Sequence, residues 1–175
     1  TFSVLDESGD VETEFADNDQ NVSGIDGGSE TVDENSSLSS DMEDDSDSSA
    51  YRLDFSKPVE NVDFRVNDID GDGQVRVRAY DEQGNEVPVT LTGGDKLTLS
   101  DSDGDGVDDT ATSTGGYQPD NSDDYSLGVE VDGPVSRIEI EHEMTGGADS
   151  GINVTDVHFD AASGGGAAGA GNDTL

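Results

Sequence analysis

Residues 62–66 read Val-Asp-Phe-Arg-Val, and residues 75–79 read Val-Arg-Val-Arg-Ala. In both stretches apolar and charged residues alternate, which is the period of a β-strand with one buried and one wet face. The residues between them, Asp68 to Gly73, are rich in aspartate and glycine, the residues that favour turns. These stretches therefore predict two strands joined by a turn.

The same alternation recurs on both sides of this pair. No window of the chain has a helical period, and turn signals separate the apolar runs. The sequence predicts an all-β fold, an antiparallel β-sandwich of the jelly-roll-like kind with long acidic loops. The other expected strands are 2–5, 51–55, 87–91, 97–99, 127–131, 135–140, 152–154 and 157–159.

The apolar residues are spread unevenly, and this predicts the domain organisation. Residues 1–160 are expected to form one β-sandwich domain. Within it, 26–50 is expected to be an acidic loop or insert, because its second half holds few large apolar residues. Residues 161–168 resemble a flexible Gly/Ala linker. Because of how it begins and ends, we expect the chain to be a piece of a longer protein.

The charge of the chain excludes several classes of partner. There are 43 acidic residues against 7 basic ones, a net charge of −36. Phosphate binding needs clustered Lys and Arg, so neither nucleic acid nor an anionic membrane is an expected partner. No apolar run has the length needed for membrane insertion. The chain has no cysteine, which excludes disulfides, zinc–thiolate sites and a Cys nucleophile.

Residues 101–109, Asp-Ser-Asp-Gly-Asp-Gly-Val-Asp-Asp, follow the opening of an EF-hand-type calcium loop. Carboxylates at alternate positions repel one another unless a cation lies between them. The sequence predicts Ca²⁺ here, although Thr112 stands where the pattern has a bidentate Glu, which predicts weak affinity. The other interpretation is an Asp-Gly hairpin turn. The predicted ligands are Asp101, Asp103, Asp105, Asp109 and the carbonyl of Val107.

A second segment, Asp68-Ile-Asp70-Gly-Asp72-Gly73, repeats the first half of this pattern. The later ligand positions are Arg76 and Ala79, so a complete calcium loop cannot form there. Two interpretations stay open for Asp68, Asp70 and Asp72. They either bind calcium together with a carboxylate from a distant strand, or form a charged turn.

The end of the chain carries a family resemblance. Residues 169–175, Gly-Ala-Gly-Asn-Asp-Thr-Leu, are similar to the start of the glycine- and aspartate-rich nonapeptide of RTX (haemolysin-type calcium-binding) proteins. Segments such as Asp54–Phe64 and Asn67–Asp70 resemble a β-sandwich module that precedes such repeats in secreted proteins of marine bacteria. The resemblance implies type I secretion, calcium-dependent folding outside the cell, adhesion to a cell-surface glycan or protein, and a calcium ligand at Asp173.

Our sequence-based hypothesis is therefore a calcium-binding structural or adhesive module of a secreted RTX-type surface protein from a saline habitat. The alternative is a non-catalytic carbohydrate-binding jelly roll of a secreted hydrolase, with Tyr117 and Tyr125 as candidate ligand-binding aromatics. A third hypothesis, a metal-dependent hydrolase, requires His142 or His158 to meet carboxylates in a pocket. No nucleophile motif accompanies either histidine, so we do not expect an enzyme.

Overall fold

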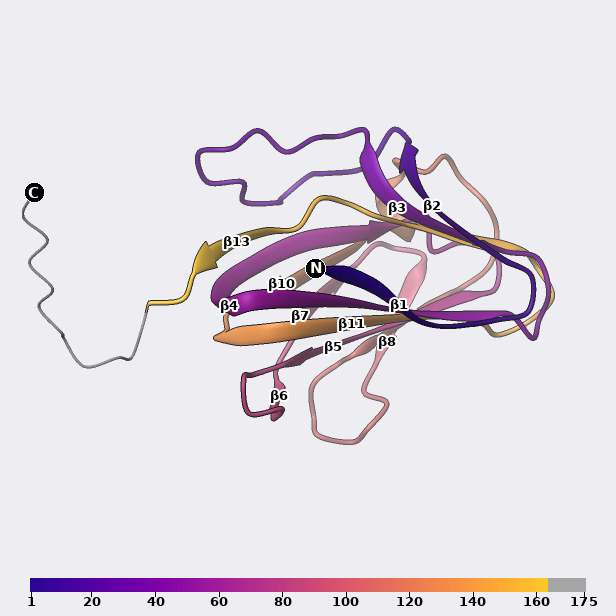
Figure 1. Cartoon of the computed structure of the whole chain (residues 1–175). Coiled ribbons are helices and arrows are strands. Elements are labelled where there is room, and N and C mark those ends of the chain that lie inside the picture. The colour runs from indigo at the N-terminus through magenta and orange to yellow at the C-terminus, as the bar shows by residue number, and fades with distance from the viewer. Residues whose placement is uncertain (164–175) are drawn as a thin grey trace, which may run out of the picture.

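The computed structural model describes residues 1–163 and is built almost wholly from antiparallel β-strands (Figure 1). The elements are β1 (Phe2–Ser8), β2 (Val11–Asp17), β3 (Ser36–Met42), β4 (Ser48–Asn67), β5 (Gly73–Tyr80), β6 (Glu86–Val87), β7 (Thr90–Gly93), β8 (Leu97–Ser100), β9 (Thr110–Ser113), the 3₁₀ turn η1 (Asp123–Tyr125), β10 (Leu127–Val131), β11 (Val135–Met144), β12 (Ser150–Val154) and β13 (His158–Ala161). Within 1–163, no helix is both long and apolar enough to cross a bilayer.

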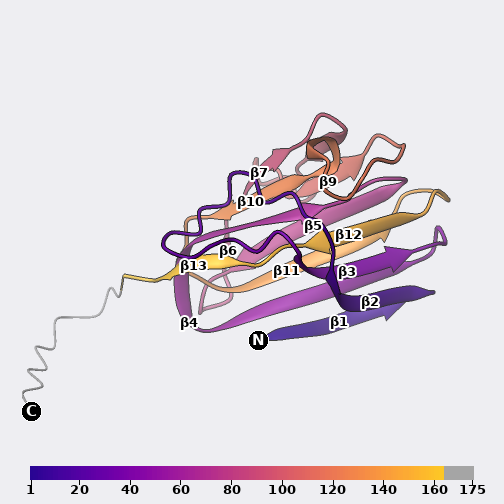
Figure 2. The ribbon, with the colours of Figure 1, turned by 90° about the horizontal axis from the view of Figure 1, so that it is seen from above.

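The strands form two layers that share β4. The first half of β4 pairs with β1 and β11, and β11 continues through β5 and β9 to β8. The second half pairs with β10 on one side and with β12 and β13 on the other, and β12 continues through β3 to β2. Figures 1 and 2 show both layers and the long strand that passes between them. The predicted antiparallel β-sandwich is confirmed.

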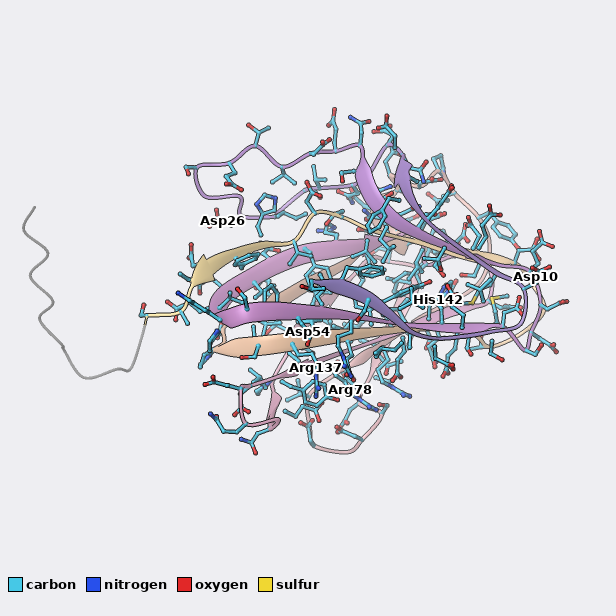
Figure 3. The ribbon with its side chains drawn as sticks, in the orientation of Figure 1. Asp10, Asp26, Asp54, Arg78, Arg137 and His142 are labelled. Atoms are coloured by element: carbon cyan, nitrogen blue, oxygen red, sulfur yellow. The ribbon has the colours of Figure 1, made fainter. Side chains whose placement is uncertain are left out.

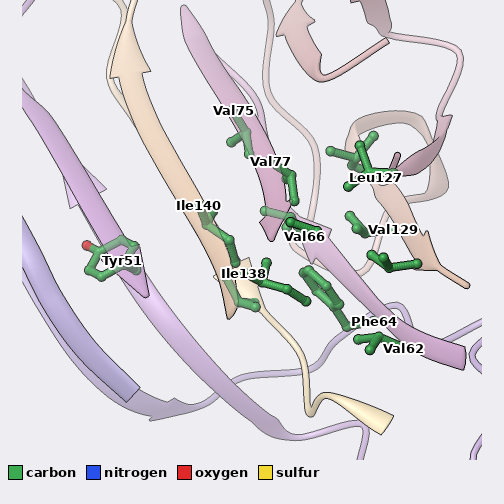
Figure 4. Close-up of a cluster of buried hydrophobic side chains, with 14 of the residues drawn as sticks. Tyr51, Val62, Phe64, Val66, Val75, Val77, Leu127, Val129, Ile138 and Ile140 are labelled. Carbon is green, nitrogen blue, oxygen red and sulfur yellow. The ribbon is translucent and has the colours of Figure 1, made fainter. Parts of the chain in front are cut away.

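The core lies between the two layers (Figure 4). Phe64 and its neighbours on β4 point inward together with alternate residues of the strands on either side. This is the arrangement that the alternation in residues 62–66 and 75–79 predicts. The fully buried apolar side chains of the cluster include Phe64, Val66, Val75, Val77, Ala79, Leu127, Val129, Ile138, Ile140 and Ile152.

The structure corrects the prediction of a 26–50 acidic loop or insert. β3 occupies 36–42 and β4 begins at Ser48, so much of that segment belongs to the second sheet and to the shared strand. Ser37, Ser39 and Ser40 are buried in β3, with Ser40 Oγ lying 3.2 Å from Ser49 Oγ. Small hydroxyl side chains that bond to one another fill space between strands without the apolar alternation on which sequence reasoning depends.

Three further differences concern strand boundaries. β2 lies in a stretch that the sequence pattern leaves as loop, and β9 lies in 110–124, which its polar composition predicts to be a loop. Pro58 does not end a strand, because β4 runs through it for 20 residues. The strand instead changes layers near this point, with a register shift against β11 between Val135 and Arg137.

The segment between β2 and β3 packs on the outer face of the second sheet. The buried side chain of Asn67 donates from Nδ2 to Gln20 Oε1 and to the carbonyl of Asn21, at 2.9 Å each. Arg65 donates from a terminal guanidinium nitrogen to the carbonyl of Ser23. These contacts hold the segment that follows β2 against the sheet (Figure 1, upper edge).

Candidate functional site

The loop between β8 and β9 brings together three of the predicted calcium ligands. One carboxylate oxygen from each of Asp101, Asp103 and Asp105 lies within 4.8 Å of the other two. Asp101 accepts hydrogen bonds from the backbone N–H groups of Gly106 at 2.8 Å and Gly104 at 2.6 Å. These hydrogen bonds lower the pKa of Asp101 and keep it ionised, as a cation ligand must be.

Asp109, predicted as a fourth ligand, faces elsewhere. Its buried carboxylate accepts from the backbone N–H of Ser102 at 3.0 Å and from the hydroxyls of Ser102 and Thr110, at 2.5 and 2.7 Å. Burial alone would raise the pKa of Asp109, but these hydrogen bonds outweigh it and lower the pKa. Asp109 therefore closes the base of the loop. Val107 N–H donates to Asp105 Oδ1, which orders the middle of the same loop.

Asp68, Asp70 and Asp72 do not share one site. Asp72 Oδ2 accepts from the N–H of Ala148, which fixes the loop between β11 and β12. Asp68, at φ 61°, and Asp70 lie close together instead. Desolvation and then the charge of Asp70 raise the pKa of Asp68 to about 8, and desolvation raises that of Asp70 to about 6.

Two more carboxylates, from distant segments, act on this pair. Asp120 and Asp41 both raise the pKa of Asp68 and of Asp70 through their charge. A Cβ placed on Gly151 would lie 2.7 Å from Asp41 Oδ1 and 3.5 Å from Asp68 Oδ2, so both side chains approach the same point. Within residues 1–163, however, only Asp101, Asp103 and Asp105 bring three possible ligand atoms within 4.8 Å of one another.

The two predicted aromatic ligand residues differ in exposure. Tyr117 is 60% exposed on the loop between β9 and η1. Tyr125 is 3% exposed, and its hydroxyl donates to the carbonyl of Gly115 at 2.6 Å. The prediction for Tyr125 is wrong on structural grounds, because its ring packs inside the domain and offers no face to a ligand.

The histidines lie in different settings. His142 is completely buried among core residues, where burial lowers its pKa to about 3, and its Nε2 is 3.3 Å from Ser150 Oγ (Figure 3). It is therefore neutral at ordinary pH. His158 begins β13 on the outer face of the second sheet, opposite Asp63 of β4.

An apolar groove of about 720 Å³ opens between the two layers beside the bend of β4. One wall comes from β1 and β4, and the other from β2, β3 and the chain around β13. Two edge-to-face ring pairs lie along it, with centroids 5.6 Å apart for Phe2 and Phe15, and 5.1 Å apart for Phe55 and Phe159. Polar groups that line the groove include Ser36, Asp54, Lys57, Thr155 and Asp156.

The exposed phenylalanine rings distinguish the groove from the rest of this acidic protein surface. Phe15 is 76% exposed and Phe159 is 51% exposed, in a chain with 43 acidic residues. Burying one such ring would stabilise the protein by about 2 kcal/mol. An exposed apolar patch with a polar rim is typical of a binding site. Sequence reasoning missed it, although Phe15, isolated in an acidic segment, is a signal that the sequence contains.

Solved structures similar to this chain include a phage tailspike domain and a carbohydrate-binding module. No protein-family model matches the chain, and no curated protein does either. The enzymatically active domain of bacteriophage CBA120 tailspike protein 4 superimposes with a TM-score of 0.48 at 14% identity, over 91% of this chain and 19% of that one. A β-1,3-glucan-binding CBM6 from Bacillus halodurans gives a TM-score of 0.34 at 13% identity, over 92% and 96% of the two chains. The chain spans about a fifth of the length of the tailspike domain that it matches.

Proposed function

We propose that this chain is a non-catalytic carbohydrate-binding β-sandwich whose binding site is the groove between its layers. The observation that carries the proposal is the combination of exposed phenylalanine rings with carboxylates and hydroxyls in one concave site. Sugar rings present C–H faces that pack on aromatic rings, and hydroxyls that donate to carboxylates. A groove of this size and lining meets both requirements.

The test is loss of glycan binding in a groove variant. Phe159→Ala removes a half-exposed ring from the groove and should weaken binding of an oligosaccharide chosen from a glycan array by about tenfold. Calorimetric titration of the two proteins measures the difference.

Tyr117→Ala is the matched control, because it removes a ring that is at least as exposed as Phe159 but does not line the groove. It should leave the affinity unchanged. If Tyr117→Ala abolishes binding and Phe159→Ala does not, the site is on the β9–η1 loop and the groove is the wrong assignment. If no glycan on the array binds to the protein, the proposed function is wrong.

We also propose that Ca²⁺ occupies the loop between β8 and β9 and stabilises the fold. The specific support is the convergence of Asp101, Asp103 and Asp105. With three carboxylates and no bidentate Glu, the expected dissociation constant is about 10⁻⁴ to 10⁻³ M. A module of this kind suits an extracellular or surface protein of a saline habitat. Asp173, the ligand implied by the RTX resemblance, lies outside the described residues.

Calcium at about ten times its dissociation constant should stabilise the fold by about 1.4 kcal/mol, which corresponds to a rise of about 3 °C in the melting temperature. EDTA should reverse the rise. Asp103→Asn should remove most of it, whereas Asp108→Asn, a charge-matched change in the same loop but outside the convergent group, should keep it. Equal shifts in both variants would contradict this site.

A further inference from the structure

A second cavity, of about 640 Å³, lies on the outer face of the second sheet beneath the segment 24–30. Figure 3 shows Asp26 on this segment, above the ribbon of β13. The cavity is walled by the start of β13, the middle of β4 and the end of β10. Six carboxylates line it and neither Lys nor Arg does: Asp26, Glu30, Asp63, Glu130, Asp132 and Asp160.

Three titratable side chains stand in a row across the floor of this cavity. Asp63 of β4 is the register partner of Glu130 of β10 on one side and of His158 of β13 on the other. Two like charges directly opposite each other on neighbouring strands are destabilising. A positive group bound above the row would remove that repulsion.

Part of this polar lining is free to bind a ligand. Asp63 accepts from the N–H of Asp26 at 2.7 Å, and Asp160 accepts from Asn61 Nδ2 at 2.9 Å, so these two carboxylates help to shape the cavity. Within residues 1–163, the exposed side chains of Glu130 and Asp132 have no hydrogen-bond partner and can meet a ligand. His158 Nε2 also has no partner, but this atom is buried beneath the cavity surface.

The cavity adjoins the apolar groove. Val157 and Phe159 line both of them, since β13 separates one from the other. Phe159 packs against Phe55 of the groove, and His158, the next residue along, pairs across the outer face with Asp63. A glycan of a few residues held against Phe159 therefore has an acidic pocket within reach around the edge of β13.

We propose that the glycan recognised by this protein carries free amino groups and that the acidic cavity binds the ammonium of an amino sugar. This rests on the proposed function, because it names the class of glycan. An ammonium donates three hydrogen bonds and brings the positive charge that the cavity lacks. N-acetylation removes that charge, so the cavity discriminates between the free and the acetylated sugar.

The test compares three trisaccharides by calorimetric titration: β-1,4-linked glucosamine, its N-acetylated form and cellotriose. Titrations are run in about 1 M NaCl, where the Debye length of about 3 Å suppresses attraction to the acidic surface in general. The glucosamine trimer should bind about tenfold more tightly than either neutral trimer. Glu130→Gln with Asp132→Asn should erase that preference and leave the affinity for the neutral trimers unchanged.

Glu12→Gln with Glu14→Gln removes the same two charges from the exposed face of β2 and should keep the preference. If this control lowers the affinity for the glucosamine trimer as much as the cavity variant does, the trimer is attracted by the acidic surface as a whole and the inference is wrong. If the neutral trimers bind and glucosamine is not preferred, the inference fails while the proposed function stands. Failure of all three trimers to bind overturns the inference. Should the double cavity variant not fold, Glu130→Gln alone serves, with about half the effect in kcal/mol.

Discussion

At the scale of single residues, local spacing predicted which carboxylates converge in the loop between β8 and β9, but not which carboxylates distant partners hold apart. Asp101, Asp103 and Asp105 converge as their alternation predicts, because a loop of nine residues fixes their relative positions. Asp109 does not join them, and Asp72 does not join Asp68 and Asp70, since hydrogen bonds from Ser102 and Ala148 hold these two side chains elsewhere. Such tertiary partners leave no trace in the spacing.

The raised pKa of Asp68 leads us to expect an unusual dependence of the free energy of unfolding on pH. Its pKa of about 8 in the folded state lies above its ordinary value of 3.8, so the folded protein holds a proton that the unfolded chain has lost between those pH values. The contribution of Asp68 to stability should therefore fall as pH rises from about 4 to 8, by about 2 kcal/mol after solvent screening, whereas the buried neutral His142 acts in the opposite direction only below about pH 6.5. Asp68→Asn should flatten this slope in urea unfolding measured with chelator at pH 5 and pH 8.

Asp101→Asn provides the comparison. The pKa of Asp101 is lowered in the folded state, so its contribution is present above its ordinary pKa and is lost only as pH falls below it. This variant should keep the slope between pH 5 and pH 8. Parallel slopes in Asp68→Asn and the parent would show that another group causes the effect.

At the scale of elements, alternation predicted most of the strands and missed β2, β3 and β9. β5, β10 and β11 alternate because one face packs on the core and the other faces solvent. β3 buries serines, and β2 exposes Phe15 at an edge, so neither has the expected pattern. The turns that join the strands were easier to predict, since glycine and aspartate favour turns directly.

The turn between β4 and β5 should be sensitive to substitution at Gly71. Its φ is +52°, and an added Cβ would lie 1.8 Å from the carbonyl oxygen of Asp149. Gly84 also has positive φ, at +83°, but nothing lies within 4 Å of an added Cβ. Gly84→Ala should cost about 1 kcal/mol from backbone strain alone. Gly71→Ala should cost at least about 3 kcal/mol in chemical unfolding; equal costs would mean that the neighbouring loop yields.

At the scale of the whole molecule, basic residues are concentrated on one face. Arg52 and Arg137 meet Glu139 at 3.0 and 3.4 Å, and Arg76 meets Glu141 at 2.9 Å, on the outer face of the first sheet. Arg137 also lies 4.4 Å from the ring centroid of Tyr80, and Figure 3 shows it beside Arg78. The remaining surface is left with a large excess of negative charge.

This excess predicts that salt stabilises the fold. Raising NaCl from about 0.1 M to about 1 M shortens the Debye length from about 10 Å to about 3 Å and weakens the repulsion between exposed carboxylates. The melting temperature, measured with chelator present so that calcium plays no part, should rise by several degrees. A flat or falling curve would show that the cross-strand arginine pairs dominate the electrostatics.

The candidate groove forms only in the whole folded molecule, and for that reason it could not be predicted from the sequence. Phe2, Phe15, Phe55 and Phe159 come from four separate strands, and no window of the chain contains two of them at a spacing that suggests a site. In the sequence, each of these phenylalanines taken alone is typical of an ordinary strand residue. Only the closure of the two layers brings the four rings together.

The shared strand has a mechanical consequence. β1, next to the first residue, and β13, just before the last described residues, both pair with β4. Their outer ends meet β4 close together, with Phe2 opposite Leu53 and Ala161 opposite Val59. A stretching force applied at residues 1 and 163 would therefore load these two ladders first, and the inner strands would bear tension only after β1 and β13 had peeled away.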